Sequence, residues 1–312
     1  LQCGACALAK AQAKAVPQST TTKATTPGMR LFVDISGPFT KSLIGSTYWL
    51  MIVDDYSGKK WSRFLKTKAE IHGALRAVLL SLKNVCKMDI QYIRCDNAGE
   101  NLKHINTLGL EFGFQLECTA PHTPKHNGKV ERGFAVIRER AVAMMIDAKL
   151  AMEFQKHLWA EAVSTATNLS NDTMTMKGTQ TANQLFYANT NFKQRNDYKH
   201  LYEWGRVAFV AKRDAHPKKF AEKRTKCVFL GYADDHATDT FKFYNAQTQK
   251  IILSRDVTWG EWHGRITETE QLPLFQQARE IPIQLEKEDI LNDYENSVSD
   301  QTFRIVLWDV DA

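Results

Sequence analysis

The sequence predicts an α/β protein with a mixed β-sheet covered by helices, followed by a separate small β module. Two apolar runs, 29–34 (MRLFVD) and 48–54 (YWLMIVD), predict neighbouring strands joined as a hairpin. A further strand candidate, 88–96 (MDIQYIRCD), follows an amphipathic stretch, and strand, helix and strand in this order favour a mixed sheet. From 201 to 262 the pattern changes to short alternating runs separated by glycines and polar turns, which predicts the β module.

Three helices are expected in the first part of the chain. Residues 67–86 predict the first, because apolar residues recur at helical spacing and Thr67 with Glu70 matches a capping box. A longer helix is expected at about 129–148 and a third at 153–171. The residues expected to face inward in the three helices are Ile71, Leu75, Val78, Leu82, Val130, Phe134, Ile137, Ala141, Met144, Phe154, Leu158, Ala162 and Val163.

The bulk composition is that of a globular protein. The chain has 312 residues, enough for two domains, and is 43% hydrophobic and 24% charged. No apolar run approaches the length of a membrane span, and the first residues lack the apolar stretch of a signal peptide, so no membrane partner is expected. The six cysteines are too sparse for a disulfide scaffold, which predicts a reducing compartment.

Charge is distributed unevenly along the chain. The formal net charge is +6, yet residues 263–312 contain eleven acidic and four basic residues, so the rest of the chain is strongly basic. A basic body favours a polyanionic partner such as DNA, although a basic protein without such a partner would have the same composition. Residues 263–312 are expected to be an acidic, partly disordered linker, and the Thr-, Ser- and Pro-rich residues 16–28 a linker.

Three acidic residues occupy comparable places in the expected elements. Asp34 ends the first strand, Asp96 ends a later strand and Glu131 begins the long helix. Three converging carboxylates repel one another unless cations neutralise them, and hard oxygen ligands select Mg²⁺ or Mn²⁺. Such a site can activate a hydroxyl and stabilise the leaving oxygen of a phosphodiester. The alternative is that these acids are ordinary polar residues of loops.

Four motifs stand in one order along the chain: LFVDISGPF (31–39), YWLMIVDDYSG (48–58), IRCDNAGEN (93–101) and TAPHTPKHNGKVERGF (119–134). Together they resemble the catalytic core of retroelement integrases, specifically those of the Ty1/copia class of LTR retrotransposons. The stretch at 226–259 is similar to the small β-barrel module that follows that core, and CGACALAKAQAK at the start resembles the end of the family's zinc-binding module. The resemblance covers about residues 1–262.

The resemblance implies a particular domain organisation. Residues 29–190 would be an integrase catalytic core with the RNase H-like fold, a mixed five-stranded sheet with flanking helices. Residues 199–262 would be an SH3-like β-barrel module, and residues 1–15 the end of a His-His-Cys-Cys zinc module. Cys3 and Cys6 would then be half of a zinc site, with Zn²⁺ bound only if a pair of histidines lies upstream of Leu1, since no histidine precedes His72. Alternatively, the two cysteines are incidental.

The resemblance also implies roles for individual residues. The Asp-Asp-Glu triad of the family falls on Asp34, Asp96 and Glu131, which would be the catalytic residues and the Mg²⁺ ligands. The 34 residues between Asp96 and Glu131 are one fewer than is common in the family. Asp54 and Asp55 match a family pair, and we expect them to organise the turn after their strand.

Basic and polar residues near Glu131 and in the β module are candidate DNA contacts. A helix N-terminus favours phosphate, and a basic run favours non-specific, salt-sensitive contacts to a DNA backbone. A solvated helix face and a merely basic loop are the alternatives. The candidates are Lys125, Asn127, Lys129, Arg132, Lys218, Lys219, Lys223 and Arg224.

The expected function is that of an integrase cut from a longer polyprotein. It would join the 3′-hydroxyl ends of the element's DNA to double-stranded target DNA by phosphoryl transfer. The resemblance implies a homo-multimer on DNA and action in the nucleus after assembly in cytoplasmic particles. One alternative is a nuclease of the same fold that only hydrolyses, and another is a degenerate or domesticated integrase that binds DNA without catalysis.

Overall fold

The structure is a computed structural model. It describes residues 23–96, 99–118, 127–149, 152–174, 178–190, 201–212, 220, 222–233, 236–237 and 239–260, without the side chains of 99–101 and 152–154. The predictions for residues 1–15 and 263–312, and for most of 16–28, concern residues outside these described ranges. In the described part, no helix combines the length and apolar character needed to cross a membrane.

The first sheet is mixed and five-stranded, as predicted. Its strands are β1 (Arg30–Ser36), β2 (Tyr48–Asp54), β3 (Lys60–Leu65), β4 (Tyr92–Cys95) and β5 (Gln115–Cys118), in the order β3-β2-β1-β4-β5. β1, β2 and β3 pair antiparallel, which confirms the predicted hairpin, while β1 pairs parallel with β4 and β4 with β5. This strand order and these directions are those of the RNase H-like fold.

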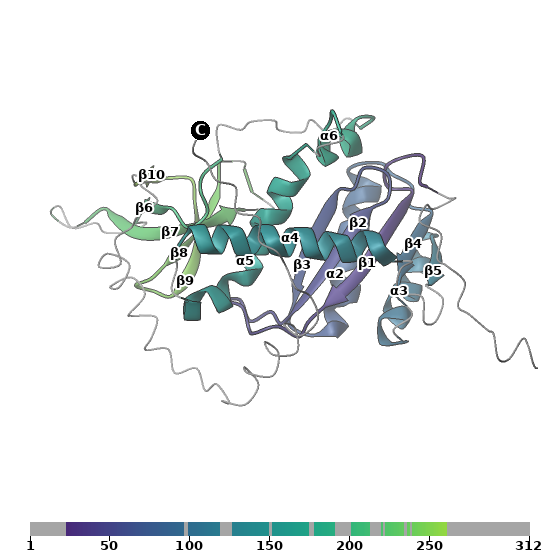
Figure 1. The fold of residues 1–312 in the computed structure, drawn as a ribbon, viewed down its shortest axis with the longest axis horizontal. Helices are drawn as coiled ribbons and strands as arrows, with labels where there is room; N and C mark the ends of the chain where they lie inside the picture. Colours follow the sequence, from purple (N-terminus) through teal and green to yellow (C-terminus); the bar gives the residue numbers. More distant parts are fainter. Residues whose placement is uncertain are drawn as a thin grey trace, which may run out of the picture.

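Helices cover both faces of this sheet (Figure 1). They are a 3-10 turn η1 (Lys68–Glu70), α2 (Ile71–Asn84), α3 (Gly99–Phe112), α4 (Gly128–Asp147), α5 (Met152–Asp172) and α6 (Ala182–Tyr187). The side chains of β1 and β2 alternate between two apolar clusters, as strand geometry requires. Leu31, Val33 and Leu50 pack with α2 and α3. Phe32 and Met51 pack with α4 and α5.

The helix predictions are confirmed for the apolar faces of α2 and α4 and for Leu158, Ala162 and Val163 of α5, and corrected at one end. The side chain of Phe154 lies outside the described part of the structure. Ile71, Leu75, Val78 and Leu82 are buried in α2 as predicted. The predicted capping box is wrong, because Thr67 makes no side-chain cap bond. The carboxylate of Glu70 instead accepts a hydrogen bond of 2.9 Å from the backbone N–H of Lys66. A short 3-10 turn therefore precedes α2, and the α-helix starts four residues later than expected.

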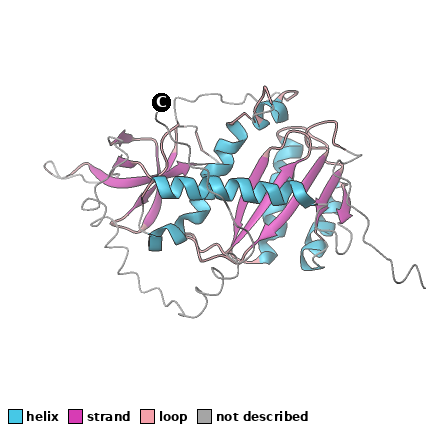
Figure 2. Ribbon diagram, viewed as in Figure 1, coloured by secondary structure: helices cyan, strands magenta, loops and turns pink. Residues whose placement is uncertain are grey.

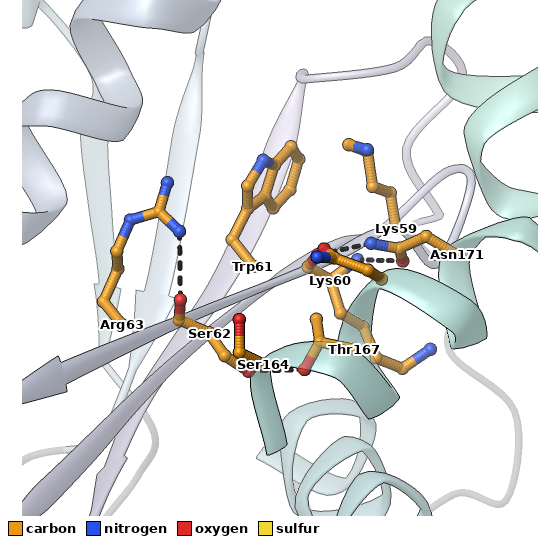
Figure 3. A pocket seen from close by; sticks show the side chains of 9 residues that line it. Lys59, Lys60, Trp61, Ser62, Arg63, Ser164, Thr167 and Asn171 are labelled. Atoms are coloured by element: carbon orange, nitrogen blue, oxygen red, sulfur yellow. Dashed lines mark hydrogen bonds between the residues drawn. The ribbon is translucent and has the colours of Figure 1, made fainter. Parts of the chain in front are cut away.

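Helix α5 covers the exposed edge of the sheet at β3. The amide of Asn171 accepts from the Lys60 N–H at 2.9 Å and donates to the Lys60 carbonyl at 2.7 Å, as a neighbouring strand would. Figure 3 shows these bonds, together with the contact between Ser62 and Thr167. An unpaired edge strand is a template for unwanted strand pairing, so these side chains protect the edge.

The second sheet forms the β module and is antiparallel throughout (Figure 2). Its strands are β6 (Val207–Ala211), β7 (Arg224–Tyr232), β8 (Phe241–Asn245), β9 (Lys250–Ser254) and β10 (Val257–Trp259), in the order β10-β6-β7-β8-β9. One face carries an aromatic cluster of its own, built around Phe229, Phe241 and Phe243. The predicted all-β module is therefore present.

The β module packs directly on α5. Val228, Leu230 and Tyr244 belong to the same apolar cluster as Leu158 and Ala162 of the helix. The hydroxyl of Thr165 and the indole N–H of Trp204 both donate to the Leu230 carbonyl, each at 3.0 Å. A side chain at Gly231, where φ is +130°, would lie 2.2 Å from the Thr165 hydroxyl, so only glycine permits this approach.

Glu161 of α5 is buried at this junction. Its side chain is 7% exposed, and its Oε2 has no hydrogen-bond partner in the described part of the chain. Burial raises the pKa of Glu161 to about 7, against the opposing effects of its own backbone N–H and of Lys242 on β8. A carboxylate in this place is costly, whereas a neutral carboxylic acid is tolerated.

Glu161→Gln should therefore stabilise the chain at pH 8. The raised pKa means that the folded chain holds the proton of Glu161 more tightly than the unfolded chain does. The free energy of unfolding therefore falls as the pH rises from 4.5, the ordinary pKa of a glutamate, to about 7. We expect a gain on the order of 2 kcal/mol at pH 8 that shrinks towards zero near pH 4.5, measured by urea unfolding. The exposed Glu139→Gln is the control. An equal gain for Glu161→Gln at pH 5 and pH 8 would contradict this account.

Candidate active site

Three neighbouring elements carry the three predicted acids. β1 and β4 pair parallel with Val33 opposite Cys95, so the next residues, Asp34 and Asp96, lie side by side. Asp96 directly follows β4 as predicted, but Asp34 does not end its strand, because β1 continues to Ser36 in its pairing with β2. Asp34 has the same side-chain direction as Phe32, towards α4, because side chains alternate along a strand. Glu131 is in the first turn of α4. Figure 1 shows α4 lying across the sheet with this end near β1 and β4.

The electrostatics of Asp34 show that the three acids are close enough to interact. Partial burial is the main cause that raises the pKa of Asp34 to about 6, and the negative charges of Asp96 and Glu131 are smaller contributions to the same rise. The N–H of Ile35, which donates to Asp34 Oδ1 at 2.8 Å, opposes this rise. The fold thus concentrates negative charge here, and among the described residues no ion pair with Asp34 offsets it.

The donor set suits a hard divalent cation. Carboxylate oxygens are the ligands that Mg²⁺ and Mn²⁺ prefer, and a cation would relieve the repulsion that adds to the effect of burial on the pKa of Asp34. Within the described residues, however, no group of three or more His, Cys, Asp or Glu side chains is gathered closely enough to hold a metal ion. The role of the triad as metal ligands therefore stays a prediction.

The predicted DNA contacts near Glu131 differ in their exposure and in their hydrogen bonding. Arg132 is exposed at the start of α4, and Lys125 lies outside the described residues. Asn127 is the N-cap residue of α4 but is only 3% exposed, and neither its Oδ1 nor its Nδ2 has a hydrogen-bond partner in the described structure. Lys129 donates to both the carboxylate and the carbonyl of Asp55, so its ammonium has an internal partner.

The Asp pair after β2 does more than organise a turn. Asp54 does so as predicted, accepting from the N–H and hydroxyl of Ser57 at 2.7 Å each and from the Gly28 N–H at 2.8 Å. Asp55 instead accepts from the Ala24 N–H at 2.8 Å and pairs with Arg30 and Lys129. Burial opposes ionisation of Asp55, but the Lys129 hydrogen bond, the Ala24 N–H and the charges of Lys129 and Arg30 lower its pKa below the ordinary value.

The predicted residues of the other candidate sites are only partly described. Lys223 and Arg224 are exposed at the start of β7, and the Arg224 guanidinium donates to the Phe209 carbonyl at 3.1 Å. Lys218 and Lys219 lie outside the described residues, as do Cys3 and Cys6.

A polar hollow between β3 and α5 is separate from the three acids (Figure 3). It opens at the β3 edge, whereas Asp34 and Asp96 lie two and three strands further along the sheet. Its basic lining comes from Lys59, Lys60 and Arg63. Lys59 is surrounded by the rings of Trp61, Phe186 and Tyr187, and burial lowers its pKa to about 8. Lys59 also donates to the side-chain oxygen of Asn183 on α6, which connects this helix to the start of β3.

Sequence reasoning did not find three charged residues that form ion pairs on the sheet. Arg30, Arg94 and Glu117 are joined by ion pairs with one another and with Asp55, for which only a role in the turn was expected. The only signal in the sequence was the presence of charges inside or directly after apolar strands, such as Arg30 in MRLFVD and Arg94 in YIRC.

Comparison with known sequences identifies relatives of the chain. Residues 206–271 match the family model of the retroviral polymerase SH3-like domain. The chain is 29% identical over 233 residues to the retrovirus-related Pol polyprotein from transposon TNT 1-94 of Nicotiana tabacum, covering 74% of the chain. It is 24% identical over 261 residues to the corresponding polyprotein from transposon RE1 of Arabidopsis thaliana, covering 84% of the chain. Its homologues are retrovirus-related Pol polyproteins of plant copia-type transposons. The aligned part is 17% of the length of each of these relatives.

Solved structures give a weaker likeness. A chain of the simian T-cell lymphotropic virus intasome in complex with the PP2A regulatory subunit B56 gamma has a TM-score of 0.44 and 14% identity, covering 84% of this chain and 88% of that one. The HTLV-2 integrase catalytic core domain in complex with magnesium has a TM-score of 0.37 and 16% identity. This match covers 52% of the present chain and 98% of that one.

Asp34→Asn should stabilise the chain when a chelator removes divalent cations. The folded-state pKa of about 6 lies above the ordinary 3.8, so the ionised side chain costs stability that grows as the pH rises between these values. We expect the unfolding temperature to rise by a few degrees at pH 8 and by less at pH 5. The exposed Asp89→Asn is the control. A lower unfolding temperature for Asp34→Asn at pH 8 would show that Asp34 is not under electrostatic strain.

Proposed function

We propose that the chain is the integrase portion of a copia-type Pol polyprotein and joins 3′ ends of element DNA to target DNA. The observation that carries the proposal is the parallel pairing of β1 and β4, which sets Asp34 beside Asp96 within electrostatic range of Glu131. Homology to Pol polyproteins and the retroviral SH3-like match support the same family. The basic body of the chain suits double-stranded DNA as partner.

In the proposed reaction a terminal 3′-hydroxyl attacks a phosphorus of target DNA. The new P–O bond forms as the bond to a target 3′-oxygen breaks, which leaves a free 3′-hydroxyl on the target strand. Asp34, Asp96 and Glu131 would hold Mg²⁺. Bound Mg²⁺ would supply Lewis-acid stabilisation of the attacking and leaving oxygens and of the phosphoryl charge.

Other residues of the chain would position the DNA. Arg132 is exposed in the first turn of α4, where backbone N–H groups and the helix dipole favour phosphate. Lys223 and Arg224 would add salt-sensitive phosphate contacts from the β module. Because the module packs on α5, its basic end has a fixed relation to the acids. Action as a homo-multimer and in the nucleus are parts of the same proposal.

Joining of DNA ends tests the proposal directly. The chain, assembled on a DNA duplex that carries a labelled 3′-hydroxyl, should join that end to a plasmid when Mg²⁺ is present. Asp96→Asn should reduce joining below detection, because one metal ligand is lost, while salt-sensitive DNA binding stays. Asp89→Asn should retain joining. If the assembled, unsubstituted chain binds DNA and never joins it, the chain is instead a DNA-binding protein without catalysis.

A further inference from the structure

Five charged side chains form a continuous series of ion pairs beside the three acids. Lys129 pairs with Asp55, and Arg30 lies 3.5 Å from the same carboxylate. The other side of the Arg30 guanidinium is 3.0 Å from Glu117, which Arg94 contacts at 2.7 Å. We call these five residues the ion-pair chain. Its members come from four strands or strand ends and one helix, and directly paired members are as far as 87 residues apart in the sequence.

The ion-pair chain joins the three elements that carry the acids. Lys129 is on α4 with Glu131, and Arg30 is on β1 with Asp34. Arg94 is on β4, which ends directly before Asp96. Asp55 and Glu117 are the two anions that bridge these cations, and neither belongs to the triad. A shift of α4 against β1 would therefore have to break the contact of Lys129 with Asp55.

Burial makes these contacts selective for one geometry. The side chains of Asp55 and Arg30 are 4% and 7% exposed, so an unpaired charge at either place would be strongly unfavourable. Lys129 Nζ and Arg94 Cζ also lie 5.6 Å and 5.5 Å from the ring centre of Phe32. Phe32 is two residues before Asp34 and has the same side-chain direction. The cations thus contact the β1 surface on which the acids meet.

We propose that Asp55 is a positioning residue, which holds Lys129 and thereby fixes the first turn of α4 so that Glu131 faces Asp34 and Asp96. The proposal rests on the function proposed above. Asp55 does not touch the reacting atoms, and its effect passes through α4. Outer groups of this kind typically change metal affinity or activity by about 10–100-fold when they are replaced.

The same contact gives Lys129 a role different from a DNA contact. Lys129 Nζ reaches the Asp55 carbonyl at 2.7 Å as well as its carboxylate. If Lys129 served only to bind phosphate, replacing it would weaken DNA binding and reduce the slope of log K against log salt concentration by about one. Metal binding would not change. A positioning lysine would weaken metal binding in the absence of DNA.

Titration of the 312-residue chain with Mn²⁺ alone separates these roles. Free Mn²⁺, followed by its electron paramagnetic resonance signal, reports binding without DNA. Asp55→Asn keeps the shape and an acceptor for the Ala24 N–H but loses the charge that holds Lys129. We expect roughly 10-fold weaker Mn²⁺ binding, a matching rise in the Mg²⁺ needed for half-maximal joining, and unchanged DNA affinity.

Asp54→Asn is the matched control. Asp54 is the preceding residue and is also buried, and in the described part of the chain its carboxylate accepts hydrogen bonds from Ser57 and Gly28, neither of which belongs to α4. It should leave Mn²⁺ binding and the Mg²⁺ requirement within about twofold of the unsubstituted chain, whereas a merely structural effect of charge loss would alter both variants alike.

Lys129→Met tests the other end of the contact and does not depend on the folding of the Asp55 variant. The Lys129 side chain is 41% exposed, so this change is tolerable for folding. We expect the same loss of Mn²⁺ binding as in Asp55→Asn, no further loss in the double variant, and partial recovery in Lys129→Arg. Normal Mn²⁺ binding in Lys129→Met, or additive losses in the double variant, would overturn the proposal.

The outcome for the unsubstituted chain distinguishes the two proposals. If that chain binds no Mn²⁺ and joins no DNA, the proposed function fails. If it binds Mn²⁺ and joins DNA while Asp55→Asn behaves like Asp54→Asn, the function stands and the positioning role of Asp55 is refuted.

Discussion

The parallel pairing of β1 with β4 is the contact on which the candidate site depends. It places Asp34 and Asp96 one residue beyond the Val33 and Cys95 pair. Leu31 and Val33 are buried against α2 and α3, so a slip of one residue would turn Asp34 into that apolar cluster. Apolar packing on one face of the sheet thus determines where the acids lie on the other face.

Like charge is the second constraint at this end of the sheet. Asp34, Asp96 and Glu131 concentrate negative charge where partial burial already disfavours ionisation. The ion-pair chain beside them contains three cations and two anions, so it offsets part of that charge. The fold therefore uses one set of acids for the candidate chemistry and another, Asp55 and Glu117, to hold the elements together.

The junction between the core and the β module gives the molecule a fixed arrangement. The face of the module's sheet that carries Val228 and Leu230 packs on α5. The aromatic cluster of the module lies on the other face of that sheet. The absence of a side chain at Gly231 lets the strand approach Thr165 closely. Because the contact is apolar and hydrogen-bonded, the basic start of β7 keeps its direction relative to the acids.

The sequence predicted elements whose apolar pattern is local and regular. The runs of β1 and β2, the buried faces of α2 and α4, and the positions of Asp96 directly after β4 and of Glu131 in the first turn of α4 follow from spacing alone, whereas Asp34 lies inside β1. The sequence predicted neither α3 nor β5. β5 gives no signal because it is only four residues long and its side chains do not alternate between buried and exposed. The capping box failed because Glu70 bonds Lys66 and not its expected partner.

What the sequence by itself determined is which residue types stand at the ends of strands and at the start of α4. Only the tertiary structure decided that the charges of Asp96 and Glu131 act on Asp34. It alone also decided that Lys129 pairs with Asp55, 74 residues away. It also decided that Asn127 is buried and that Asn171 seals the β3 edge. The physical reason is that ion pairs, parallel strand pairing and helix docking join residues far apart in sequence, for which local periodicity has no signal.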